Sequence, residues 1–292
     1  MSYLDRIRAC QLFDPSAFRP FRADGATVGW VRPELAAALA AFPEVFVVDE
    51  HAVALNPNLK GFDARTKAVA AVVRTLGARG ILDDWRGEMF AVGARFDRPL
   101  FAIDRGAVPA FGVRGYGIHV NGVVRDGPDL ADPGDPATGV RMWVGRRSLD
   151  KRLAPGKLDQ MVAGGQPAGL SLRENLLKEA AEEAAVSPEM AARARPVGAI
   201  SYCTQRPEGL RNDVLFLYDL DLPASFVPRN TDGELSGFEL WPIERVAEAV
   251  RDTEDFKFNC ALVMIDFLIR HGLIGPEEPD YLDLVAGLHL AV

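Results

Sequence analysis

The chain has 292 residues, of which 33 are basic and 41 acidic, so its formal net charge at pH 7 is −8. This acidic balance argues against sequence-independent binding to nucleic acid or to an anionic membrane surface. Hydrophobic residues make up 48% of the chain and charged residues 25%, as in a folded globular protein and unlike a disordered or fibrous one. The length favours two compact units.

The cysteines and the N-terminus bear on cellular location. Cys10, Cys203 and Cys260 are far apart and belong to no CxxC or Cys/His cluster, so their spacing predicts neither a disulfide framework nor a structural zinc site. The N-terminal residues MSYLDRIRACQLFD carry charges where a signal peptide has its apolar stretch. Apolar runs stay shorter than the roughly 18 residues of a membrane span. We therefore expect a cytoplasmic protein without membrane partners.

Residues 1–113 read as a small α+β domain. Pro33 at a first helical position predicts a helix over 33–42, and apolar spacing that ends at glycines predicts another over 62–80. Alternating apolar residues predict strands within 46–55 and within 88–104, the second with a turn near residues 97–99. This part contains no recognisable catalytic motif.

A second domain is expected over residues 114–292, with a helical C-terminal extension from about residue 251. Strand-like runs at 116–126 and 140–147 flank a Pro-, Gly- and Asp-rich segment at 127–139, which predicts a long-looped hairpin. The later elements expected from periodicity and capping signals are a helix at 172–185 opened by the capping box Ser171–Glu174, a short helix from Pro188, a strand at 214–222, a strand leading into a helix across 238–250, and a buried helix at 259–272 ending at Gly272.

The helix at 172–185 carries three carboxylates on one face. Glu179, Glu182 and Glu183 stand at positions i, i+3 and i+4, which places them on one arc of roughly 100°. Like charges at this spacing cost a helix about 0.2–0.5 kcal/mol per pair, and carboxylates in the last turns face the negative end of the helix dipole. A divalent cation such as Mg²⁺, which prefers oxygen ligands, would compensate them. The alternative is a solvated acidic face.

The segment before this helix favours the metal-binding interpretation. Residues 163–169, AGGQPAG, are predicted to form a Gly-rich loop in which backbone can approach the helix and hold a metal-phosphate group beside the carboxylates. From Gly164 to Val186 the chain resembles the Nudix hydrolase signature over its full 23 positions without a gap. Gly164, the three glutamates and Val186 match, and Ala180 is a weak match for an apolar position.

Three positions depart from that signature. Leu170 replaces the first Glu, which removes a polar brace of the Gly-rich segment; Lys178 replaces Arg and can still pair with a helix carboxylate as a point charge. Ala185 replaces the last Gly, from which we expect a different helix ending. All three carboxylates that bind metal in the family are retained.

The resemblance extends over most of residues 114–275. Over this range the chain resembles a Nudix subfamily that includes the domain fused to fungal thiamine pyrophosphokinase. It is carried by segments such as PGKLDQMVAGG, NDVLFLYDLDLP and FNCALVMIDFLIRHG. The resemblance implies an α+β fold, a Nudix-type α/β/α sandwich with a mixed sheet, preceded by a small α+β domain. It also implies Mg²⁺- or Mn²⁺-dependent hydrolysis of a small-molecule diphosphate, with thiamine diphosphate or its oxidised forms as substrate and a homodimer as one assembly.

On this interpretation Glu179, Glu182, Glu183 and Lys178 are catalytic, and the three glutamates bind the metal. Gly164, Gly165, Arg146, Lys157 and Glu234 are candidate substrate or phosphate-binding residues, and Asp232, Arg147 and Arg152 are further candidates. A solvated turn explains Asp232 and Glu234 equally well, and exposed charge explains Lys157 equally well and the three arginines better. Trp85, Trp143 and Tyr116 could stack on a substrate ring or belong to the core. His119 is expected to be a packed histidine and not a ligand.

Other functions remain open. Hydrolysis of a nucleoside diphosphate derivative is the alternative reaction, and a Nudix-fold protein that binds a metabolite without cleaving it is the alternative class. A Nudix-type isomerase would need a Cys/Glu pair at its site, and the positions of Cys203 and Cys260 do not support one.

Overall fold

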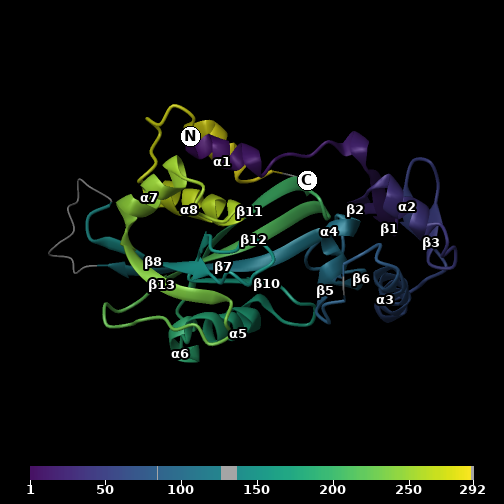
Figure 1. Cartoon of the computed structure of the whole chain (residues 1–292), viewed down its shortest axis with the longest axis horizontal. Helices are drawn as coiled ribbons and strands as arrows, with labels where there is room; N and C mark the ends of the chain where they lie inside the picture. The colour runs from purple at the N-terminus through teal and green to yellow at the C-terminus, as the bar shows by residue number, and fades with distance from the viewer. Residues whose placement is uncertain (84, 126–136, 291–292) are drawn as a thin grey trace.

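The computed structural model describes residues 1–83, 85–125 and 137–290. The molecule is elongated (Figure 1): the small sheets of the N-terminal unit occupy one end, and a larger sheet with helices on both faces occupies the other. Three predicted features therefore lie partly outside the described residues, namely the loop at 127–139, the end of the strand at 116–126 and the end of the C-terminal extension.

The N-terminal unit contains a four-stranded sheet in the order β2-β1-β4-β3 and a separate hairpin β5-β6. Its elements are β1 (Arg19–Ala23), β2 (Ala26–Val31), α2 (Pro33–Leu39), β3 (Phe46–Val48), β4 (Val53–Leu55), α3 (Phe62–Ala78), β5 (Met89–Val92), β6 (Phe101–Asp104) and α4 (Val108–Phe111), with short 3-10 turns at Pro15–Ala17 and Arg105–Ala107. Both predicted helices are confirmed. The strand segment 46–55 is two strands, because Asp49 Oδ1 accepts from the backbone of His51 and Ala52 and closes a turn.

The second unit is built on a mixed sheet in the order β11-β12-β7-β8-β13, with β10 paired to β7 and β9 paired to β8. Strands β7 and β12 run parallel, and the other pairs are antiparallel. Its strands are β7 (Arg114–Arg125), β8 (Val140–Arg147), β9 (Leu158–Asp159), β10 (Val162–Gly165), β11 (Arg195–Arg206), β12 (Gly209–Asp221) and β13 (Leu235–Pro242). The pairing of β7 with β8 confirms the predicted hairpin.

Helices cover both faces of this sheet (Figure 1). One face packs against α5 (Leu172–Ala184) and α6 (Pro188–Ala191), and the opposite face against α7 (Ile243–Asp252), α8 (Phe258–Arg270), α9 (Tyr281–Gly287) and α1 (Tyr3–Ala9). Helix α8 is buried nearly all round, as its composition predicts, and the chain leaves it at Gly272, whose φ is +74°. Within the described ranges, no helix is long and apolar enough to span a bilayer.

Helix α1 packs away from the rest of the N-terminal unit. Tyr3, Leu4 and Ile7 belong to the hydrophobic core that also contains α7 and α8, and the Tyr3 hydroxyl donates to the carbonyl of Ala247 at 3.2 Å. The first residues therefore complete the core of the second unit. The division of the chain at residue 113 stays a prediction. The architecture itself is the expected α+β fold, a mixed sheet between helical layers.

Candidate functional site

Helix α5 begins and ends through local sequence signals. Ser171 Oγ accepts from the Glu174 backbone at 3.2 Å, while Glu174 Oε2 accepts from the Ser171 backbone at 2.8 Å, so the predicted capping box is formed. The predicted change of helix ending is wrong. Ala185 takes the left-handed conformation that glycine favours, with φ +52° and ψ +33°, at a cost of roughly 1–2 kcal/mol for a residue with a Cβ.

Two of the three carboxylates of α5 point at strand β10. The Glu183 carboxylate is buried and accepts a hydrogen bond from the Ala163 backbone at 2.7 Å. The Glu179 carboxylate lies over Gly164, where a Cβ would stand 2.4 Å from Glu179 Cδ. Glycine is required at position 164 because any side chain would occupy the space of this carboxylate.

The third carboxylate faces outward and shares a lysine with the first. Glu182 has a half-exposed side chain, and its Oε2 lies 2.7 Å from Lys178 Nζ, which also contacts Glu179 Oε1 at 3.0 Å. The expectation that Lys178 pairs with a helix carboxylate is confirmed. Hydrogen bonds to Glu182 and Glu179 outweigh the opposing effect of burial and raise the pKa of Lys178, so this ammonium stays charged.

Negative charge accumulates around α5 beyond what one lysine offsets. Burial raises the pKa of Glu183 well above its usual value, and the carboxylates of Asp159, Glu179 and Glu234 raise it further, against the hydrogen bond from Ala163. Burial also raises the pKa of Glu179. Such carboxylates are stabilised in their charged form by a nearby cation.

The residues present fit a hard divalent ion. Glu179, Glu182 and Glu183 offer carboxylate oxygens, which Mg²⁺ and Mn²⁺ prefer. The Glu183 side chain is buried and that of Glu179 is 12% exposed, and Gly164 leaves space beside them. These three residues would hold the ion, whose charge would then offset that of the site.

The Gly-rich segment is partly a strand and not, as predicted, a loop throughout. Ala163, Gly164 and Gly165 belong to β10 and pair with β7 opposite Gly117–His119. The strand forms because these glycines leave room for Glu179 on one side and for Phe90 on the other, where a Cβ on Gly165 would stand 2.5 Å from Phe90 Cζ. Local composition suggests a loop here, and tertiary contacts override it.

Polar bracing of this segment survives the loss of a glutamate at position 170. Gln166 Nε2 donates to the carbonyl of Leu170 at 2.7 Å, and Asn175 Nδ2 donates to the carbonyl of Gly165 at 2.8 Å. Gln166 and Asn175 are both buried. Two amides therefore supply the support that the Nudix signature assigns to a carboxylate.

Residues 229–234 approach the C-terminal end of α5. Thr231 donates to the carbonyl of Glu182 through its hydroxyl at 2.6 Å and its backbone at 3.2 Å. Glu234 is near enough to raise the pKa of Glu183, and it pairs with Lys151 at 2.8 Å. Asp232 Oδ1 instead accepts from Asn230 and from the Glu234 backbone within the turn. Glu234 thus lies by the carboxylates, and Asp232 shapes the turn.

The candidate basic residues have partners elsewhere. Arg146 bonds to the carbonyl of Gly156 at 3.2 Å and to Glu239 at 3.5 Å, and Lys157 Nζ donates to the carbonyl of Glu254 at 2.5 Å. Arg147 forms a buried ion pair with Asp159 at 2.6 Å, and Arg152 pairs with Asp83 at 2.9 Å. A phosphate-binding role for Arg146 and Lys157 stays a prediction. Lys151, which pairs with Glu234, is a basic residue that the sequence did not single out.

The three candidate aromatic residues have different environments. Trp143 is buried in the core beneath α5, and Trp85 packs in the N-terminal unit under Arg74, whose guanidinium carbon lies 4.2 Å from the ring centroid. Tyr116 packs at 4.8 Å, ring centroid to centroid, against Phe96, which the N-terminal unit supplies. Trp143 is thus a core residue, whereas Tyr116 lies where the two units meet.

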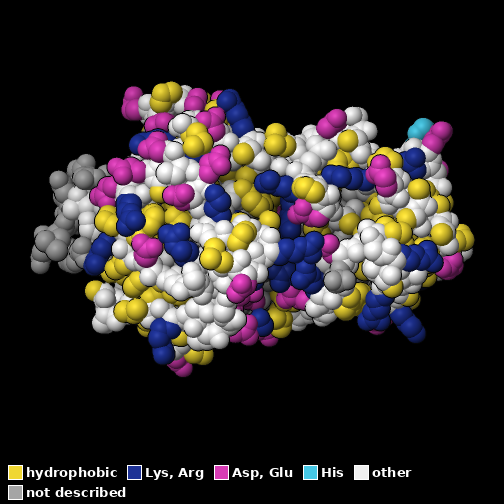
Figure 2. All heavy atoms as spheres, viewed as in Figure 1, with side chains coloured by type: hydrophobic (Ala, Val, Ile, Leu, Met, Phe, Trp, Pro, Cys, Tyr) yellow, Lys and Arg dark blue, Asp and Glu magenta, His cyan; other side chains and the backbone are white. Residues whose placement is uncertain are grey.

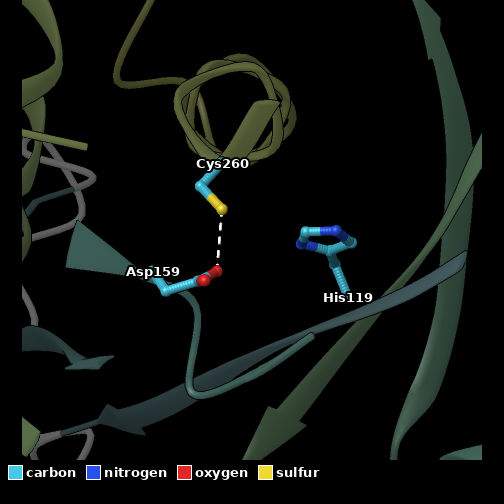
Figure 3. A group of neighbouring side chains, drawn as sticks. All are labelled: His119, Asp159 and Cys260. Atoms are coloured by element: carbon cyan, nitrogen blue, oxygen red, sulfur yellow. Dashed lines mark hydrogen bonds between the residues drawn. The ribbon is translucent and has the colours of Figure 1, made fainter. Parts of the chain in front are cut away.

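A second cluster of titratable side chains lies where β7, β9 and α8 meet (Figure 3). His119, Asp159 and Cys260 are buried, and each places one ligand-type atom within 4.8 Å of the others. Cys260 Sγ donates to Asp159 Oδ1 at 2.7 Å, and His119 Nδ1 lies 2.7 Å from Gln160 Oε1. His119 is packed, as expected. The grouping itself is invisible to spacing rules because its members are far apart in the sequence.

Two cations already serve the carboxylate of this cluster. Arg147 Nη1 lies 2.6 Å and Lys257 Nζ 3.8 Å from Asp159 Oδ2. Burial raises the pKa of Asp159, but Lys257 and Arg147 outweigh it and bring the pKa to about 2. A metal ion would have to compete with both side chains, so we interpret the cluster as a structural junction that ties α8 to the sheet.

This junction predicts a pH dependence of stability. Burial, with Lys257 nearby, lowers the pKa of His119 from 6.5 to about 4. The unfolded chain therefore takes up this proton at a higher pH than the folded chain, and stability falls as the pH drops from about 6.5 to about 4. The contribution is about 3 kcal/mol over that window. Urea unfolding of His119→Gln across pH 7 to 4 should lack this loss, whereas exchange of the exposed His51 to Gln should retain it.

The N-terminal unit reaches the carboxylate site of α5 through residues that carry no sequence motif. The Ala168 backbone donates to the carbonyl of Met89 at 2.7 Å, and Phe90 contacts Gly165. Glu88 is near enough to Glu179 to raise its pKa. No motif marks these residues, because their relation to α5 exists only after the two units pack together.

Comparisons with known proteins found a matching family model, similar sequences and similar solved structures. A family described as "Domain of unknown function (DUF4743)" matches residues 2–115. Nudix hydrolase 24 of Arabidopsis thaliana is 44% identical over 97% of this chain and 76% of its own length, and Nudix hydrolase 20 of the same plant is 43% identical over 91% and 71%. The crystal structure of DR0079 from Deinococcus radiodurans, 24% identical, covers 61% of this chain and 97% of its own with a TM-score of 0.42.

The names of both plant relatives include the word chloroplastic. They overturn the expectation of a cytoplasmic protein, which rested on the charges of the N-terminal residues. Charges in place of an apolar stretch argue against a secretory signal, but chloroplast transit segments have no such apolar stretch, so this observation does not bear on a chloroplast location. The two matches, each above 40% identity and covering more than two thirds of the relative, show that the chain belongs to the Nudix hydrolase family.

Proposed function

We propose that the protein is a divalent-metal-dependent pyrophosphohydrolase that cleaves a small-molecule diphosphate, with thiamine diphosphate or an oxidised form of it as substrate and the monophosphate as product. The observation that carries the proposal is the meeting of the α5 carboxylates with the side-chain-free backbone of Gly164. The thiamine assignment depends on the sequence resemblance across residues 114–275.

Each residue then has a distinct task. Glu179, Glu182 and Glu183 would hold Mg²⁺ or Mn²⁺, which when bound supplies Lewis-acid stabilisation of charge on the diphosphate. Glu182, with its half-exposed side chain, is placed to orient water or accept its proton. The Lys178 ammonium pairs with both Glu179 and Glu182 and so reduces the repulsion between their carboxylates. Glu234, in the segment 229–234 that contacts the C-terminal end of α5, lies near the same carboxylates.

A substrate panel tests this function. The protein would be incubated with thiamine diphosphate, its oxidised analogues, ADP-ribose, NADH and dNTPs, and the monophosphate products would be measured. Each compound would be tested with Mg²⁺ or Mn²⁺ and, in a separate control reaction, with EDTA in place of the metal. We expect metal-dependent turnover with preference for a thiamine-type diphosphate. Preference for a nucleotide would contradict the substrate assignment, and binding of a diphosphate without turnover of any compound would indicate a metabolite-binding protein instead.

A further inference from the structure

The hairpin of the N-terminal unit presents an arginine beside the Gly-rich segment. Arg105 follows strand β6, and its Nη1 donates to Glu88 Oε2 at 2.8 Å. Phe90, two residues beyond Glu88, contacts Gly165 of the Gly-rich segment, and the neighbouring Met89 carbonyl accepts from the Ala168 backbone at 2.7 Å. The guanidinium carbon of Arg105 lies 5.9 Å from the centroid of the Phe90 ring. Arg105 therefore stands at the edge of the carboxylate site.

A buried aspartate fixes both arms of this hairpin. Asp104 is fully buried and accepts hydrogen bonds from the backbone of Arg86 at 3.0 Å, Gly87 at 2.8 Å and Gly106 at 2.9 Å. The Arg105 backbone also donates to the carbonyl of Glu88 at 2.8 Å. The Arg105–Glu88 ion pair is itself part-exposed, so it contributes little stability. Such rigid support exceeds what a surface ion pair requires and suits a side chain that must hold a ligand.

A diphosphate substrate needs cationic side chains beside the carboxylates of α5. A diphosphate approaching α5 meets concentrated negative charge, and Lys178 and Lys151 are each paired with carboxylates of the site. Arg105 is 55% exposed at its side chain and, in the described parts of the chain, forms an ion pair with Glu88 alone. A guanidinium has five N–H donors, so it can bind a phosphate while retaining Glu88.

Basic and acidic side chains both lie on the surface near the junction of the two units (Figure 2). Figure 2 shows Lys and Arg side chains gathered close to the junction of the two units, with Asp and Glu beside them. Arg152 of the second unit also pairs with Asp83 of the N-terminal unit. This ion pair is a further contact between the two units.

The geometry points to Arg105 as a phosphate-binding residue that the N-terminal unit supplies to the carboxylate site, with Glu88 as its positioning residue. This inference rests on the proposed function for its substrate, a small-molecule diphosphate. It gives the N-terminal unit a direct task in substrate binding.

The test separates binding from chemistry. Arg105→Ala should raise KM for the preferred diphosphate about 10- to 100-fold, the effect of losing a charged hydrogen bond, while kcat changes less than about threefold. Arg105→Lys should recover part of the loss because it restores the charge without the fork. The matched control is Arg95→Ala, which removes an exposed, ion-paired arginine of the same unit and should leave both constants unchanged.

A binding measurement makes the outcome independent of turnover. Calorimetry with Mn²⁺ and methylenediphosphonate, which cannot be hydrolysed, should show about tenfold or greater weakening in Arg105→Ala, with Mn²⁺ binding alone unchanged. Unchanged affinity for methylenediphosphonate and unchanged KM would overturn the role of Arg105 while leaving the hydrolase intact. Arg105-dependent binding without turnover of any diphosphate would support the role of Arg105 and refute the proposed function.

Discussion

Glu183→Gln is expected to lower the kcat/KM of metal-dependent diphosphate hydrolysis by at least two to three orders of magnitude while the protein stays folded. Loss of a charged metal ligand removes several kcal/mol of transition-state stabilisation. The amide oxygen of glutamine can still accept from the Ala163 backbone, which holds the carboxylate at 2.7 Å. Steady-state kinetics with saturating Mg²⁺ would measure the loss.

The free energy of unfolding of Glu183→Gln should not fall together with its activity. Burial raises the pKa of Glu183 well above its usual value, so the charged side chain is costly in the folded state and a neutral amide avoids that cost. We expect urea unfolding at pH 7 to show unchanged or higher stability, the pattern of a residue retained for function. Glu248→Gln, at an exposed position of α7, should alter neither quantity. Full activity of Glu183→Gln would refute the assignment.

Gly164→Ala should reduce activity about 100-fold with a smaller effect on folding. The added Cβ would stand 2.4 Å from Glu179 Cδ and 2.6 Å from its Cγ. These atoms belong to a flexible side chain, so the Glu179 carboxylate moves away and the strand pairing of β10 survives. A displacement of about 1 Å at a catalytic group costs on the order of 10²-fold in rate. Kinetics and circular dichroism together would measure both effects.

The matched control is Gly275→Ala, because no atom lies within 4 Å of the Cβ built at that glycine. It should retain wild-type activity and stability. We also expect Gly164→Ala to weaken Mn²⁺ binding, because the Glu179 carboxylate, one of the three, is displaced. Wild-type turnover and Mn²⁺ affinity in Gly164→Ala would show that the contact with Glu179 has no role in the site.

The carboxylate site was predictable because its information is local. Ser171 and Glu174 set the start of α5, and the spacing of Glu179, Glu182 and Glu183 sets a common face, whatever the helix packs against. The predicted loop and the predicted helix ending were wrong, because tertiary contacts determine the backbone conformation there. Gly164 and Gly165 form a strand because Glu179 and Phe90 occupy the space of their missing side chains, and Ala185 keeps a left-handed ending although it is not glycine.

Charge assignments were harder to predict than positions. Arg146 and Lys157 flank the Gly-rich segment in the sequence, yet their side chains bond to Glu239 and to the carbonyl of Glu254. Long basic side chains reach partners from several directions, so proximity along the chain does not choose among them. Lys151 and Arg105 come next to the site only through the folded arrangement of Glu234 and Glu88.

The sequence by itself determined the helix that carries the three glutamates, because helix periodicity and capping act over a few residues. Its resemblance to the Nudix signature also indicated the family. Only the tertiary structure decided which carboxylates are buried, that Asp159 and Cys260 meet across 101 positions, and that the N-terminal unit contributes Glu88, Phe90 and Arg105. Those relations arise from packing between elements distant in the chain, and one sequence carries no local signal for them. The net charge of −8 likewise does not show which carboxylates lie close together, because packing brings a few of them together around α5.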